Sequence, residues 1–143
     1  MKRQIITLNL PDDAQSLIAP FEDDYALLLV IASPSISMEQ RDRITSDIVT
    51  SRCQYALTFG HDCALWHDMI DEACIGDGTG KERFLMTTWH DNEPIADVID
   101  FLWSNTFYDN FKPKRLAIVQ IGFNDELKAA ISKRLSYHQN QQS

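Results

Sequence analysis

Reactive side chains gather directly after two apolar runs of this chain. His61, Asp62 and Cys63 follow residues 55–59, and His90 and Asp91 follow residues 84–89. A cysteine near a helix N-terminus can have a lowered pKa, and a histidine oriented by a carboxylate can act as its base. One interpretation is therefore a hydrolase-type enzyme or a small-molecule-binding protein that uses His90, Asp91, His61 and Cys63.

No motif fixes the mutual geometry of these groups. The chain has no nucleophile elbow or other specific catalytic signature, and a small buried cysteine is an ordinary core residue. A metal site is a further alternative. Cys63 and His67 are four residues apart in the sequence, and His61 and His90 are two more candidate ligands. However, no CxxC or HExxH pattern is present. The sequence therefore favours a protein that is not an enzyme and has no metal site and no cofactor.

Residues 76–80 form a glycine-rich segment. In phosphate-binding loops such a segment follows a strand and precedes a helix, so that the helix N-terminus meets the phosphate. Here it follows an expected helix and precedes an expected strand. This order argues against phosphate binding.

The acidic residues are concentrated in one part of the sequence. Residues 60–110 hold eleven acidic and two basic residues, a net charge of −9, whereas the rest of the chain sums to +1. The total charge of −8 argues against nucleic-acid binding, which needs a basic surface. A charge run is commonly a solvated helix face, but complementary potentials also attract a basic protein partner.

Composition sets the class of protein. Three cysteines without paired spacing do not suggest a disulfide framework, and the N-terminus lacks the continuous apolar stretch of a signal peptide. No run of apolar residues is long enough to span a membrane. These features predict a cytoplasmic protein without membrane contact.

Strand and helix patterns alternate four times, which predicts a single-domain α/β protein with a doubly wound, flavodoxin-like sheet of about four parallel strands. Strands are expected at 26–32, 55–59, 84–89 and 116–121. Ser37, Asp62 and Asn124 are expected N-caps of helices, and Pro94 lies in the first turn of another. Residues 1–24 form an N-terminal edge segment that adds a possible strand, 25–136 the α/β domain and 137–143 a polar tail.

The commonest order of such a sheet places the third of these strands beside the first. Its switch point would then form a pocket lined by Ser33, Ser35, Thr88 and Trp89, next to His90. The second and third helices would lie side by side and merge their acids into one patch. The expected partner-binding residues are Asp62, Asp68, Asp71, Glu72, Asp91, Glu93, Asp97 and Asp100.

Two segments resemble an uncharacterised bacterial domain family. They are Gly60–Trp66, with the pattern Gly-x-Asp-Cys-x-x-Trp, and Met86–Pro94, with the pattern Met-Thr-Thr-Trp-His-x-x-Glu-Pro. The resemblance covers roughly residues 25–122; it implies the same α/β arrangement and brings no activity. By analogy alone, small acidic immunity proteins such as barstar block basic toxins with an acidic helix face, although no motif of barstar is present.

The leading hypothesis is a non-catalytic, acidic binding protein of the bacterial immunity or antitoxin type. It would neutralise a basic protein partner, such as a toxin, through its acidic helix face.

Overall fold

A computed structural model describes residues 2–76 and 84–142 of the chain. The described elements follow one another as five strands and four helices. They are β1 (Gln4–Leu10), β2 (Tyr25–Ile31), α1 (Met38–Thr50), β3 (Cys53–Gly60), α2 (Cys63–Ile75), β4 (Met86–His90), α3 (Ile95–Ser104), β5 (Arg115–Ile121) and α4 (Asp125–Gln141). No described helix is long and apolar enough to cross a membrane.

All strand pairs in the sheet are parallel, and the strand order is β1-β5-β2-β3-β4. β2, which is buried along its whole length, lies at the centre, as its continuous apolar sequence predicts. The expected four-stranded sheet thus has a fifth strand, because the N-terminal segment pairs with β5 and forms one edge.

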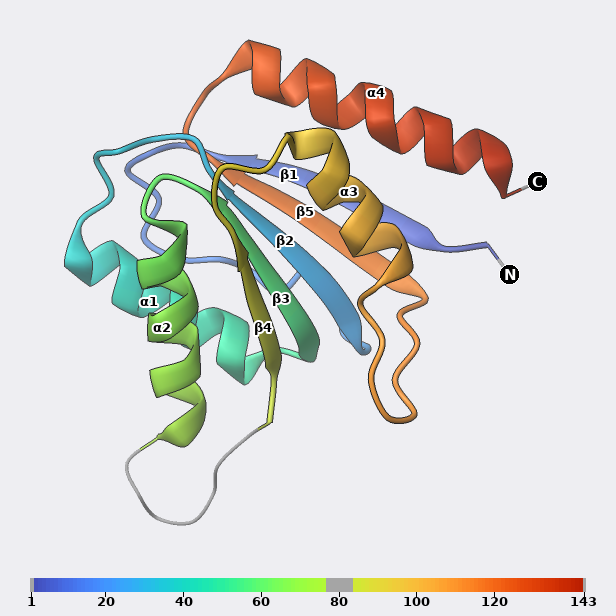
Figure 1. The fold of residues 1–143 in the computed structure, drawn as a ribbon. Coiled ribbons are helices and arrows are strands. Elements are labelled where there is room, and N and C mark those ends of the chain that lie inside the picture. The colour runs from blue at the N-terminus through green and yellow to red at the C-terminus, as the bar shows by residue number, and fades with distance from the viewer. Residues whose placement is uncertain (1, 77–83, 143) are drawn as a thin grey trace.

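The helices cover the sheet in pairs (Figure 1). α1 packs against α2 on one face, and α3 packs against α4 on the other. Each face has its own apolar core, in which alternate residues of β2 take part: Leu27 and Leu29 face α1 and α2, whereas Leu28 and Val30 face α3 and α4.

The expected strand order is wrong. β3 lies beside β2 as expected, but β5, not β4, is the other neighbour of β2, and β4 pairs with β3 and forms the second edge of the sheet. The burial of the strands gives the reason: β5 is buried almost throughout and needs a neighbour on each side, whereas β4 is short and half-buried. The acidic α2 and α3 consequently lie on opposite faces and do not pack side by side as expected (Figure 1).

The helix ends follow local rules in two of the expected places. Ser37 and Gln40 form the expected capping box, and the Asn124 side chain accepts a hydrogen bond from the Leu127 amide. Asp62 has the N-cap position of α2 but no side-chain cap bond, because its φ of 56° places it in the left-handed region. Pro94 is the N-cap of α3, one residue before the helix begins.

Two boundaries also differ from the expected ones. β4 begins at Met86, two residues later than the expected start at residue 84, and it ends at His90, one residue beyond the expected end. α4 continues to Gln141, through most of the expected polar tail.

Candidate functional site

The ends of β3 and β4 bring together part of the group that sequence reasoning selected. Phe59 on β3 pairs with His90 on β4, so the residues that follow both strands lie at the same edge of the sheet. The Cys63 thiol lies within the electrostatic reach of Asp91 and hydrogen-bonds the backbone of His90. His61 is exposed to solvent beside them.

The Cys63 thiol is not activated. Burial raises its pKa above the ordinary value, and the negative charge of Asp91 raises it further, while backbone hydrogen bonds only partly oppose both effects. The lowered pKa expected from the helix N-terminus is therefore wrong, because loss of solvent and a neighbouring carboxylate both disfavour the thiolate. A thiol of this kind is a weak nucleophile at neutral pH.

The His90 imidazole faces the other side of the sheet. The residue is 4% exposed and its ring lies edge-on to Phe101 of α3, with centroids 4.9 Å apart. Nε2 hydrogen-bonds Thr88 Oγ1 at 2.8 Å, and Nδ1 hydrogen-bonds Glu93 Oε2 at 3.0 Å. Both ring nitrogens are thus engaged, and the thiol meets the backbone of His90, not its imidazole.

The expected switch-point pocket does not form from the residues chosen for it. Ser33, at the end of β2, packs against Gly122 at the end of β5: a Cβ at Gly122 would lie 2.7 Å from the Ser33 Cβ. Ser33 Oγ also accepts a hydrogen bond from the Ser35 amide at 3.2 Å. Thr88 and Trp89 are separated from them by β3, because the strand order differs from the expected one.

His67 of α2 binds carboxylates instead of completing a metal site. Its Nδ1 lies 3.0 Å from Asp68 Oδ1 and its Nε2 lies 3.6 Å from Asp71 Oδ2. Within residues 2–76 and 84–142, no group of three or more histidine, cysteine or acidic side chains is placed to hold a metal ion. Of the glycine-rich segment, residues 77–80 lie outside the described residues.

Two of the acids expected to bind a partner are paired with arginines of the described chain. Asp100 on α3 accepts hydrogen bonds from Arg134 of α4 at 2.7 and 2.9 Å, and from His138 at 2.6 Å. Asp62 lies 3.7 Å from Arg41 of α1. These contacts link helices to one another, so their carboxylates are less available to a partner than the sequence suggests.

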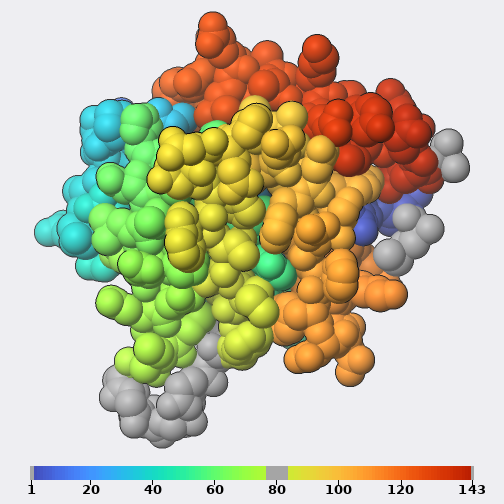
Figure 2. Space-filling model, viewed as in Figure 1, coloured from blue at the N-terminus to red at the C-terminus, as the bar shows by residue number. Residues whose placement is uncertain are grey.

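Other acids lie along the edge strand β4 and just beyond its C-terminal end. Thr87 donates a 2.6 Å hydrogen bond to Asp71, and the His67 ring lies 4.7 Å from the Trp89 ring. Figure 2 shows α2 in green beside β4 and the start of α3 in yellow on one face of the molecule. We define the β4 acidic surface by its residues: Asp68, Asp71, Trp89, Asp91 and Glu93.

The carboxylates of this surface are not neutralised by strong bases in the described part of the chain. There, none of the salt bridges joins a lysine or arginine to Asp68, Asp71, Asp91 or Glu93. Trp89 is 51% exposed among them. Glu72 and Asp97, also expected to contact a partner, are exposed on α2 and α3.

A family model for a domain of unknown function, DUF7684, matches residues 5–137. The chain belongs to this family. The DUF7684 match includes β1 and most of α4, so the domain extends beyond residues 25–122 on both sides. No curated protein and no solved structure matches this DUF7684 chain.

The exposure of Trp89 is the feature of this DUF7684 domain that sequence reasoning missed. Its place in an apolar run predicts a core or pocket residue. The signal for exposure lies in β4 itself, where two threonines precede the tryptophan and no apolar residue follows it. Such a sequence fits an edge strand better than a central one.

Proposed function

We propose that this DUF7684 protein is a non-catalytic binding protein of the bacterial immunity or antitoxin type. Its β4 acidic surface would hold a basic protein partner, such as a toxin, and so neutralise it. The observation that carries the proposal is the half-exposed Trp89 among four carboxylates that have no lysine or arginine partner in the described residues.

Tryptophan contributes large amounts of binding energy at the centres of protein interfaces, and it is enriched among hot-spot residues. Its large ring loses little conformational entropy on binding. Here the ring already rests against His67, which limits its freedom before a partner arrives. Trp89 therefore suits the apolar centre of an interface with a polar rim.

The surrounding carboxylates suit the rim. Asp71 is held by Thr87, and Glu93 is held by His90, so each is oriented before binding. Oriented charges speed the encounter with a basic partner and disfavour acidic ones. β4 is also an edge strand, and its outer backbone groups can bind a segment of the partner.

The alternative, a hydrolase-type or small-molecule site around Cys63 and His90, has weaker support. The thiol has a raised pKa, and the imidazole is buried with both nitrogens engaged on the other side of β4. Neither group is ready to attack a substrate or to accept a proton from one.

The test begins with a pull-down from the native host lysate at low and high salt, and the retained protein is then purified. Its Kd is measured for the wild type and for a variant that neutralises the β4 acidic surface. That variant carries Asp68→Asn, Asp71→Asn, Asp91→Asn and Glu93→Gln.

A matched control removes the same charge elsewhere on the surface. It carries Glu39→Gln, Asp42→Asn, Asp125→Asn and Glu126→Gln, all at exposed positions of α1 and α4. We expect the first variant to lose binding while the control keeps it. Equal binding by both, or a lysate that yields no basic partner at low salt, would overturn the proposal.

A further inference from the structure

The other edge of the sheet, β1, lacks the features that normally protect an edge strand. Exposed edges usually carry charged residues, proline or a bulge. The seven residues of β1 include no charged residue and no proline, and their register with β5 is unbroken. Leu8 is 36% exposed on this strand.

The backbone of β1 has a row of groups that point away from the sheet. Gln4 donates to the Lys114 carbonyl and Leu10 accepts from the Gly122 amide, so these residues face β5. Because successive residues of a strand point their backbone groups in opposite directions, Ile5, Thr7 and Asn9 face outward. In the described chain, no hydrogen bond outside the β1–β5 ladder engages the backbone groups of these three residues. The Asn9 side chain donates a 3.3 Å hydrogen bond to the Gly122 carbonyl.

We infer that β1 pairs with β1 of a second copy of this chain. The strands would run antiparallel about a two-fold axis at Thr7, so that each Ile5 meets Asn9 of the second copy. Ile5, Thr7 and Asn9 would each lie opposite a residue of the second copy whose backbone groups also point outward. The pairing would therefore form six backbone hydrogen bonds. The result is a dimer with one continuous sheet of ten strands.

The side chains of β1 are complementary to themselves in this register. Ile6 and the exposed Leu8 share one face of the strand, and the two-fold axis places each Ile6 opposite Leu8 of the second copy. Such cross-strand apolar pairs stabilise sheets. The same axis brings Lys2 toward Asp12 of the second copy, which adds opposite charges at both ends of the interface.

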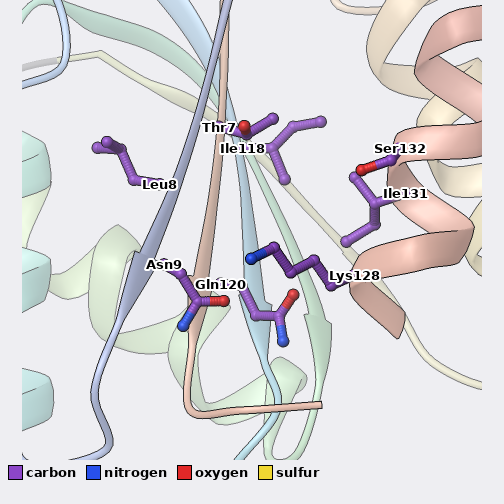
Figure 3. Close-up of a pocket in the computed structure, with 8 residues that line it drawn as sticks. All are labelled: Thr7, Leu8, Asn9, Ile118, Gln120, Lys128, Ile131 and Ser132. Atoms are coloured by element: carbon purple, nitrogen blue, oxygen red, sulfur yellow. The ribbon is translucent and has the colours of Figure 1, made fainter. Parts of the chain in front are cut away.

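The α4 side of β1 borders a cavity. A cavity of about 220 Å³ lies between β1, β5 and α4. Figure 3 shows Thr7 and Asn9 on the α4 side of β1, with the Lys128 side chain reaching from α4 toward the strand, and Leu8 on the opposite side. A strand added at β1 would cover the outer side of this cavity.

The dimer leaves both β4 edges uncovered, because β1 and β4 are the opposite edges of the sheet. Each end of the ten-stranded sheet would then present one β4 acidic surface. The dimer interface does not depend on the function of that surface.

The first test is cross-linking of a Thr7→Cys variant. Hydrogen-bonded antiparallel residues have Cβ atoms about 5.5 Å apart, slightly more than the roughly 3.5–4.5 Å of a disulfide, so a short bifunctional thiol reagent is used as the cross-linker. We expect cross-linked dimers for Thr7→Cys, and none for wild type or for a Ser46→Cys control at an exposed position of α1. Equal cross-linking by both variants would overturn the register.

The second test measures mass in solution by light scattering. We expect the wild type at twice the mass of the 16.4 kDa chain. Thr7→Pro removes an outward N–H without touching the β1–β5 ladder and should give a folded monomer, whereas Thr7→Val should remain a dimer. A monomeric wild type at every concentration, or a dimeric Thr7→Pro variant, would overturn the inference.

The third test uses charge reversal. Lys2→Glu alone and Asp12→Lys alone should each weaken the dimer by about tenfold. The double variant should regain most of that loss, because the two charges meet across the axis. Additive losses would contradict the proposed register.

Discussion

Asp100 of α3 and Arg134 of α4 form a two-pronged ion pair, with Oδ1 2.7 Å from Nε and Oδ2 2.9 Å from Nη2. His138 adds a third hydrogen bond to the same carboxylate and stacks on Trp103 of α3. The hydrogen bond from Arg134 is the largest cause that holds the pKa of Asp100 below its usual value. Asp100, which the sequence analysis assigned to partner binding, therefore links α3 to α4 on one face of the sheet.

Asp100→Asn should lower the free energy of unfolding by about 0.5–1 kcal/mol, because the Asp100 side chain is 36% exposed and partly screened by solvent. Since the folded-state pKa is lowered, this stability is present above the ordinary carboxyl pKa of 3.8 and is lost as the pH falls through the lower folded-state value. Urea unfolding from pH 7 to pH 2 should show the wild type and the variant converging at the acidic end. Exposed Glu72→Gln serves as the control, and a constant difference at all pH values would contradict the assignment.

His90→Ala should destabilise the fold by about 2 kcal/mol, since it opens a cavity beside Phe101 and removes the hydrogen bonds to Thr88 and Glu93. Exposed His61→Ala should change stability by less than about 0.5 kcal/mol. Thermal or urea unfolding measures both. If His90→Ala unfolds like the wild type, the imidazole does not stabilise the α3 side of β4.

Cys63 should react slowly with iodoacetamide in the folded protein. Its side chain is buried, and its raised pKa leaves less thiolate at pH 8 than an ordinary cysteine has. Mass spectrometry of the Cys63 peptide should show labelling that accelerates with urea, as the protein opens. Fast labelling in native buffer, absent in a Cys63→Ser variant, would indicate an accessible and activated thiol.

Much of this architecture follows from local sequence. The unbroken apolar run of β2 predicts a central strand, and the spacing of Ser37 and Gln40 predicts the start of α1. The strand order does not follow from such patterns, because it depends on which neighbours each strand acquires. The contrast between the apolar β5 and the threonine-containing β4 was the available signal that β4 forms an edge.

The candidate site was predictable in composition but not in arrangement. The concentration of acids near β4 could be read directly from the sequence. The pairing of Asp100 with Arg134 could not, because the two residues lie 34 positions apart and meet only when α3 and α4 pack on the same face. Asp62 is the predicted N-cap of α2, but its left-handed backbone and the missing side-chain cap bond could not be predicted from the sequence.

Gly60→Ala should cost much more stability than Gly76→Ala. Both glycines have positive φ, 99° at Gly60 and 71° at Gly76. A Cβ at Gly60 would lie 2.3 Å from the Ile31 carbonyl oxygen, whereas a Cβ at Gly76 would have no atom of the described residues within 4 Å. That carbonyl also accepts a hydrogen bond from the His61 amide at 3.0 Å. We expect a loss of about 3 kcal/mol or more at Gly60 and about 1 kcal/mol at Gly76, measured by urea unfolding. Similar losses would mean that strain in φ, not the contact, decides both.

Trp89→Ala should weaken binding to the basic partner by at least about 2 kcal/mol, roughly 30-fold in Kd, if the ring is the centre of the interface. The stability of the free protein should change little, because the ring is 51% exposed and rests mainly on His67. Phe123→Ala, which removes a 76% exposed ring that follows β5, is the matched control and should bind like the wild type. Calorimetry of each variant with the partner separates the two effects. A Trp89→Ala protein that binds normally would leave only the carboxylates to hold the partner, and the interface would then be purely electrostatic and abolished by salt.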